Sequence, residues 1–313
     1  MRERDVAPHT VRMVDVAPGV KLEVLDFGGT GEVVVLLAGL GNTGHVFDDL
    51  APLLAGWHHV YAVTRRGFGA SSGPATGYDT ATRVADDLGA LDALGADRAI
   101  FIGHSIAGGE LSALAAEHPD RVRAVVYIDA VGDNADAAEE LARITPPPDP
   151  PRVPIDHLYD STDHVRAFVR EQLGTEWPTG EILANLTFDA DGHITGETER
   201  PDAGAQIIAG IVHSDFTRIE CPALVLAAEP PPVPKLLGSG WGRLDEAGRA
   251  AWRAYEPEMV AFWQKQRDRV KAQLRGVRWV EYPDAHHYLF VQHQRAVVGE
   301  IQQFLAALPA SSP

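Results

Sequence analysis

Apolar residues in this chain gather in short, continuous runs that alternate with longer amphipathic segments. An unbroken apolar run is typical of a strand buried on both faces, because a strand with one wet face alternates apolar and polar positions. Such runs predict strands at residues 33–39, 58–64, 99–103 and 122–129, and the segments between them predict helices at 43–55, 80–94 and 106–118. Strands that alternate with helices need crossover connections, so we predict an α/β fold class, a mostly parallel sheet flanked by helices.

Two parts of the chain depart from this alternation. Residues 11–28 alternate around Pro18 and Gly19, which predicts a hairpin of two strands. From residue 132 to about 216 no buried strand is expected; the segment holds a proline cluster, helical aromatic stretches and the loop-like "FDADGHITGETERPD". After the insertion, strands are predicted at residues 221–229 and 277–282, and helices at residues 244–274 and 294–308.

We therefore divide the chain into a core, residues 1–131 and 217–313, and a largely helical cap insertion, residues 132–216. The prolines of "TPPPDPPRVP" are interpreted as a rigid lead into a lid, with a disordered linker as the alternative.

The net charge of the chain indicates which kinds of partner to expect. The 313 residues carry a net charge of -17, which argues against nucleic acid and against an anionic membrane surface as partners and favours solubility. The N-terminus has no apolar signal region, and no stretch approaches the roughly 18 apolar residues of a membrane span. We expect a cytoplasmic protein acting on a small molecule. Its single cysteine, Cys221, has no activating context, and the oligomeric state is left open.

The segment "GHSIAG" places Ser105 at the junction between a predicted strand and a predicted helix. It fits the pattern G-x-S-x-G with Ala107 at the last position. The turn must be tight, so Gly103 and Ala107 are small to avoid a collision across it. The helix begins at the serine, where free N–H groups favour a developing negative charge. This pattern indicates a nucleophile; the alternative is a serine that only caps the helix.

A serine needs a base to become a nucleophile. The segment "YPDAHHYLFVQ" follows the last predicted strand and offers His286 and His287. Loops that leave the carboxyl ends of parallel strands are where catalytic groups collect, so this segment is the best source of the base.

Together the motifs "LLAGLGNTG", "TRRGFGASS", "GHSIAG", "VVYIDA" and "DAHHYLF" resemble those of the α/β-hydrolase family, on both sides of the insertion. The resemblance implies a serine hydrolase, esterase-like, with Ser105 as nucleophile. It also implies His287 as base, since His286 takes the place of the family's usual glycine. It further implies an oxyanion hole built from the backbone N–H groups of Ile106 and Leu40.

The acidic member of the triad is where the chain departs from the family pattern. In the family's most common position this chain has the prolines of "EPPPVP". A minority of the family takes the acid from the end of an earlier strand, which here implies Asp129. Glu229 is the alternative acid, and Asp133 is a further candidate.

The insertion also supplies aromatic residues, and we expect Phe168 and Trp177 to be substrate-binding, unless they only form the core of the cap. No H-E-x-x-H motif or paired Cys/His spacing exists, so no metal and no cofactor are expected.

The resulting hypothesis is hydrolysis of an uncharged, apolar carboxylic ester or lactone through an acyl-enzyme. A carbon–carbon bond hydrolase on the same triad and a non-catalytic ligand-binding receptor on the same fold remain alternatives. Epoxide and haloalkane hydrolysis in this family use an aspartate nucleophile, and Ser105 argues against both.

Overall fold

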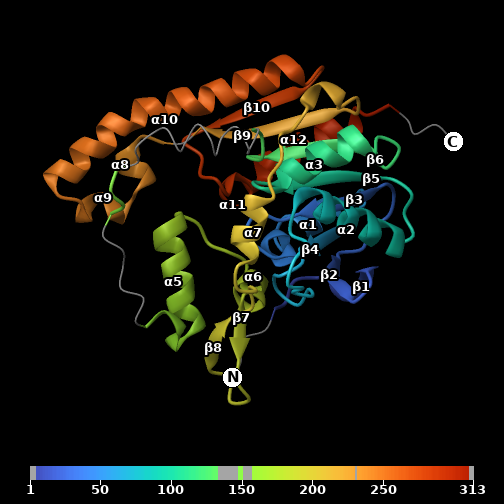
Figure 1. The fold of residues 1–313 in the computed structure, drawn as a ribbon, viewed down its shortest axis with the longest axis horizontal. Coiled ribbons are helices and arrows are strands. Elements are labelled where there is room, and N and C mark those ends of the chain that lie inside the picture. The colour runs from blue at the N-terminus through green and yellow to red at the C-terminus, as the bar shows by residue number, and fades with distance from the viewer. Residues whose placement is uncertain (1–4, 133–146, 151–156, 230, 310–313) are drawn as a thin grey trace.

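The computed structural model describes residues 5–132, 147–150, 157–229 and 231–309, and most of their strands form one eight-stranded sheet (Figure 1). Its strand order is β1-β2-β4-β3-β5-β6-β9-β10. The first three strands in that order pair antiparallel, and every later pair is parallel. The strands are β1 (Thr10–Ala17), β2 (Val20–Asp26), β3 (Val33–Leu37), β4 (His59–Thr64), β5 (Ala99–His104), β6 (Val122–Ile128), β9 (Ala223–Glu229) and β10 (Arg278–Pro283).

Helices cover both faces of the sheet. Alternate residues of each central strand enter different apolar clusters, as Val126 and Ile128 of β6 do on one face and Val125 and Tyr127 do on the other. The first face is covered by α1 (Ala51–Leu54) and α12 (Gln294–Ala306), and the second by α2 (Thr80–Ala93), α3 (Ala107–Glu117) and the end of α10 (Glu246–Gln273). The predicted fold class is confirmed, because the continuous apolar runs are strands buried on both sides.

Two predicted elements differ from the structure. Residues 43–55 form a 3-10 helix, η1 (Gly44–Phe47), followed by the short α1, rather than one helix. Pro52 lies in the first turn of α1, a position that favours proline because the N–H it lacks would have no partner within the helix, so a new helix begins there. The loop-like segment contains a hairpin, β7 (Leu186–Phe188) and β8 (Ile194–Glu197), because Asp189 accepts the backbone N–H groups that close its turn.

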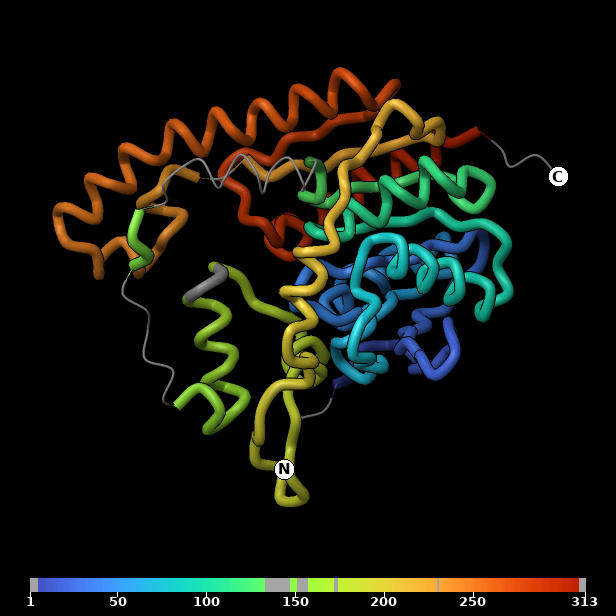
Figure 2. Tube along the Cα trace, in the orientation of Figure 1, coloured from blue at the N-terminus to red at the C-terminus, as the bar shows by residue number. Residues whose placement is uncertain are grey.

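The chain leaves the sheet after β6 and returns at β9, the strand that pairs with β6. Between them, the described part of the predicted insertion contains α5 (Thr162–Leu173), α6 (Thr179–Ala184), the β7–β8 hairpin and α7 (Ala203–Ala209). In the view of Figure 2, α5 lies on the left and α7 lies between it and the sheet. After β9 come two short helices that the sequence did not predict, α8 (Val233–Leu236) and α9 (Ser239–Arg243). Most of the proline cluster lies outside the described residues.

A buried carboxyl group joins α6 to the loop after β3. Glu181 accepts hydrogen bonds from the Asn42 side chain at 2.8 Å and from the Thr43 hydroxyl at 2.5 Å. The Asn185 amide donates a further bond at 2.9 Å. Burial raises the pKa of Glu181 to about 7, although the hydrogen bonds from Thr43 and Asn42 act in the opposite direction. The contact is therefore most stable when this carboxyl is protonated.

We expect this group to make the protein less stable as pH rises through 7. The pKa of Glu181 is higher in the folded state than in the unfolded state, so its contribution is complete below about pH 4.5 and is lost as pH rises through about 7. The loss is about 3 kcal/mol at most. Glu181→Gln has the same size and cannot ionise. Urea unfolding between pH 5 and pH 8 should therefore show a smaller decline for the variant than for the parent protein. If the free energy of unfolding falls equally with pH in the two proteins, this prediction is wrong.

Candidate active site

Ser105 occupies the turn between β5 and α3 with a left-handed backbone, at a φ of 57°. A non-glycine residue in this region costs about 1–3 kcal/mol and persists only where its surroundings hold it. A Cβ atom on Gly103 would lie 3.0 Å from the Cβ atom of Ala107, and one on Gly108 would lie 1.8 Å from the carbonyl oxygen of Ala130. The small residues around Ser105 are thus required by close contacts, as the sequence predicts.

Asp129 and His287 form a hydrogen bond at the same edge of the sheet. The Nδ1 atom of His287 lies 2.7 Å from Oδ2 of Asp129. The other carboxylate oxygen, Oδ1, accepts the backbone N–H of Ala228 in β9 at 3.0 Å. Asp129 itself follows β6 with a φ of 43°. The sheet backbone therefore holds one oxygen of Asp129 while the other faces the imidazole.

His286 takes a different position from His287. Its Nδ1 atom accepts the backbone N–H of Tyr288 at 3.2 Å, and burial lowers its pKa. The hydrogen bond to Asp129 belongs to His287 alone of the two. Of the two histidines, His287, which the family resemblance implies as the base, is thus the one that contacts a carboxylate.

His104 is a neighbour of the site that the sequence analysis missed. Its buried Nε2 atom donates to the backbone carbonyl of His287 at 3.0 Å. Burial lowers its pKa well below the usual value, so the ring is neutral. The close approach of Gly39, where a Cβ atom would lie 2.8 Å from Nδ1 of His104, completes the packing. His104 occupies a variable position of G-x-S-x-G, and only the fold brings it to His287.

The remaining acid candidates are less well placed. Glu229 ends β9, and its backbone carbonyl accepts the N–H of Ala285 at 3.1 Å. Across the described residues, no hydrogen bond joins the Glu229 carboxylate to His287. Asp133 lies outside the described residues.

Leu40 and Ile106 lie against one small apolar cluster, whose members are Phe68, Tyr78, Ala203 and Ile207. Ile106 is the N-cap of α3, where backbone N–H groups have no partner within the helix. The loop after β3 and the start of α3 are therefore neighbours, and α7 of the insertion packs onto both.

A cavity of about 470 Å³ opens at Ser105. Asp129, His286 and His287 line it together with Ser105, and the rest of its wall is mostly apolar. Much of that wall comes from α10, through Met259, Trp263 and Arg267, with Val131, Val225, Ala227, Ala228, Leu236, Trp279 and Ala285 as further lining residues.

Phe168 and Trp177 line a second cavity, of about 230 Å³, with Gly41, Tyr159 and other residues of the insertion. The two cavities share no lining residue among those described. Among the described residues, Phe168 and Trp177 thus line a different cavity from the one that Ser105 lines, and their role in substrate binding stays a prediction.

Within the described chain, two groups of side chains are close enough to share a metal ion, and neither lines the Ser105 cavity. They are Asp5, His9, His45 and Asp48, and the exposed Asp189, Asp191 and His193. The helices of the described residues include none that combines the length and apolarity needed to cross a bilayer.

Part of the chain is similar in sequence to proteins of known family. A family model for the alpha/beta hydrolase fold matches residues 32–156. Epoxide hydrolase A of Mycobacterium tuberculosis is 38% identical over 123 residues, which cover 38% of each chain. The 2-(acetamidomethylene)succinate hydrolase of Mesorhizobium japonicum is 37% identical over 102 residues, which cover 32% of this chain and 36% of that protein. These matches span little more than a third of either relative.

The likeness in fold extends much further along the chain. A solved structure of E-2-(acetamidomethylene)succinate hydrolase matches with a TM-score of 0.69 at 21% identity, covering 96% of this chain and 100% of that one. The sequence motifs, the strand order and these matches agree: the chain has the α/β-hydrolase fold, and its residues 32–156 match the model of that family.

Proposed function

We propose that this protein is a serine hydrolase in which Ser105 is the nucleophile, His287 the general base and Asp129 the acid that orients it. The observation that carries the proposal is the 2.7 Å hydrogen bond between Asp129 and His287, at the cavity that Ser105 also lines. The hydrolase names of the relatives support the reaction class.

The proposed reaction begins with attack of the Ser105 hydroxyl on a substrate carbonyl. Because Nδ1 of His287 faces Asp129, Nε2 is the nitrogen left to take the serine proton. Asp129 fixes this tautomer and stabilises the imidazolium that forms. His287 then returns the proton to the leaving group, and an acyl group remains on Ser105.

The negative charge on the carbonyl oxygen needs donors that are already in place. We assign these to the backbone N–H groups of Ile106 and Leu40, which come from neighbouring segments at the start of α3 and after β3. Water activated by His287 then attacks the acyl-enzyme and releases the acid, which regenerates Ser105.

The proposed substrate is a carboxylic ester or lactone with an apolar part. The apolar wall of the Ser105 cavity, with Met259, Trp263 and Trp279, supports this choice. Epoxide hydrolysis, the reaction that the name of one relative gives, is disfavoured because on this fold it uses an aspartate nucleophile and this chain has Ser105.

Ser105→Ala should abolish labelling by a fluorophosphonate probe and lower kcat on p-nitrophenyl esters by roughly 10³-fold or more. The alanine keeps the left-handed backbone strain of the serine, so the thermal midpoint serves as a control and should change little. Normal labelling of the variant would end the proposal. Labelling of the parent without turnover would favour a ligand-binding receptor.

Asp129→Asn should lower kcat by about 10⁴-fold, because the amide cannot hold the correct tautomer of His287. Asparagine keeps an oxygen that can accept the N–H of Ala228, so the contact between the end of β6 and β9 should be retained. The matched control is Glu229→Gln at the end of β9, which should stay within about tenfold of the parent. If Glu229→Gln loses more activity than Asp129→Asn, the acid is Glu229.

Trp263→Ala should shift the preference among acyl chain lengths toward longer chains, because it enlarges the Ser105 cavity. Phe168→Ala and Trp177→Ala alter the second cavity and should leave that preference flat. Ratios of kcat/KM over a series of p-nitrophenyl esters measure the effect. If Trp263→Ala left the chain-length preference unchanged and Trp177→Ala shifted it, the second cavity would be the acyl site.

A further inference from the structure

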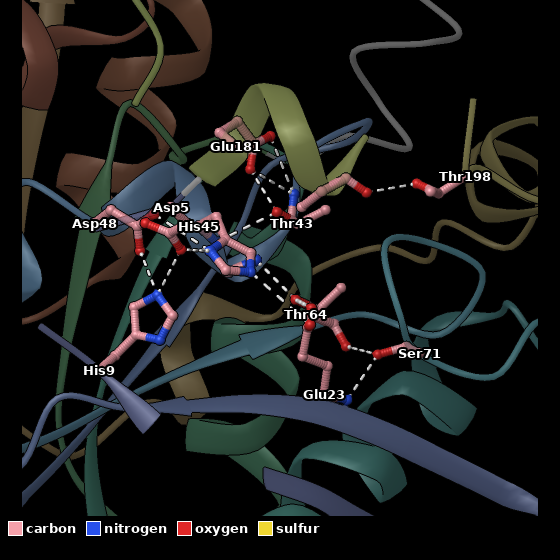
Figure 3. Close-up of polar contacts among 12 residues, drawn as sticks. Asp5, His9, Glu23, Thr43, His45, Asp48, Thr64, Ser71, Glu181 and Thr198 are labelled. Atoms are coloured by element: carbon pink, nitrogen blue, oxygen red, sulfur yellow. Dashed lines mark hydrogen bonds and ion pairs between the residues drawn. The ribbon is translucent and has the colours of Figure 1, made fainter. Parts of the chain in front are cut away.

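Four side chains with metal-binding chemistry meet between the N-terminal segment and η1 (Figure 3), and none of them lines the Ser105 cavity. Asp5 and His9 precede β1, His45 lies in η1, and Asp48 follows it. One ligand atom from each lies within 4.8 Å of all the others. No sequence motif predicts this group, because the fold brings together two segments that are far apart in the sequence.

The spacing within the group suits a tetrahedral ion. Nε2 of His9 lies 2.9 Å from Oδ2 of Asp5 and 3.4 Å from Oδ1 of Asp48. Nδ1 of His45 lies 3.2 Å from Oδ2 of Asp5 and 3.2 Å from Oδ2 of Asp48. In a tetrahedral zinc site with bonds of about 2.0–2.1 Å, neighbouring ligand atoms are about 3.3 Å apart. Each imidazole nitrogen therefore lies at ligand spacing from both carboxylates.

Three of the four side chains are also buried. The side chains of His9, His45 and Asp48 are 6%, 9% and 3% exposed. Oδ1 of Asp48 accepts no hydrogen bond from any residue in the described part of the chain. The carboxylate of Asp48 is buried and that of Asp5 is half-buried, so the pair favours a compensating charge; a divalent cation with two neutral imidazoles would leave the group uncharged.

The surroundings orient the ligands and leave room at their centre. Nε2 of His45 lies 3.8 Å from a carboxylate oxygen of Glu23, and Glu23 accepts the Thr64 hydroxyl at 2.7 Å (Figure 3). A carboxylate behind a ligating imidazole is a common way to fix the ring. At Gly180 a Cβ atom would lie 2.1 Å from Asp48 Oδ2 and 2.9 Å from His45 Nδ1, so only glycine leaves this space free.

An entry path is present as well. A surface hollow of about 360 Å³ is lined by Asp5, Asp48 and Gly180, together with Pro178 and other residues around them. An ion therefore does not have to cross the core to reach the ligands.

We propose that Asp5, His9, His45 and Asp48 bind a divalent transition-metal ion, with zinc as the best match. Two imidazole nitrogens favour zinc over magnesium or calcium, which prefer sets of oxygen ligands. Four protein ligands leave no open position, so the ion is structural and takes no part in the reaction proposed at Ser105. It ties the segment before β1 to η1, against Gly180 of α6.

A proton is the competing occupant. Although burial opposes the charged form, the neighbouring carboxylates of Asp48 and Glu23 raise the pKa of His45 to about 10. Zinc binding must therefore displace this proton, and a metal-free ion-pair network is the alternative to be tested.

The test uses the full chain after removal of metal by a chelator and dialysis. Titration with Zn²⁺ should give one ion per chain, a saturable rise in thermal midpoint and release of protons. Co²⁺ should give the visible absorption of a tetrahedral site. Mg²⁺ and Ca²⁺ should do none of these. A chain that binds no Zn²⁺ or Co²⁺ would overturn the proposal, and this result depends on no variant.

Variants locate the ion. His9→Gln and Asp48→Asn should each weaken Zn²⁺ binding by at least about 100-fold, and Glu23→Gln by about tenfold. Gly180→Ala should also abolish binding, because its methyl group fills the space beside three ligand atoms. The matched control is His193→Gln in the exposed group Asp189, Asp191 and His193, which should bind Zn²⁺ as the parent does. Equal binding by His9→Gln and the parent would assign the ion elsewhere and refute the site.

Ser105→Ala should bind zinc unchanged. A failure of the metal site is thus distinguishable from a failure of the proposed hydrolase function.

Discussion

The parallel pairing of β6 with β9 is the contact on which the rest of the structure depends. It continues past the end of β6, where the N–H of Asp129 donates to the carbonyl of Leu226 at 2.7 Å and Oδ1 of Asp129 accepts the N–H of Ala228 at 3.0 Å. These bonds close the sheet across the long excursion between the two strands. They also force Asp129 into a left-handed conformation that aims its second oxygen at His287.

A second set of hydrogen bonds ties the edge of the sheet to the insertion. The Tyr288 hydroxyl donates to Asn42 at 3.0 Å, and Asn42 donates to Glu181 at 2.8 Å. Tyr288 is the neighbour of His287, and Asn42 lies in the loop that carries Leu40. The loop with the proposed base and the loop with a proposed oxyanion donor are therefore joined to α6 through one buried carboxyl group.

What the sequence predicts well is set by local pattern and by the sheet. Continuous apolar runs locate the central strands, and the rule that catalytic groups collect at the carboxyl ends of parallel strands points to the loop with His286 and His287. The choice of His287 and of Asp129 came from the family resemblance. Pro52 is a local signal for a helix start within residues 43–55, which the prediction of one helix did not use. The missed features share another cause. His104 meets His287, Trp177 turns into a separate cavity, and His9 meets His45 only through tertiary contacts, which no spacing along the chain records.

The long helix α10 is held by the core at one end only. Val270 and Leu274, at and just beyond its last turn, belong to the apolar cluster on one face of the sheet, whereas Met259 and Trp263 lie nearer its start and line the Ser105 cavity. Trp263 lies about two turns before Val270, so one helix carries both cavity-lining residues and residues that stabilise the sheet. Changes at Met259 and Trp263 can alter which substrates fit while the sheet keeps its packing, so substrate selectivity can change at little cost in folding free energy.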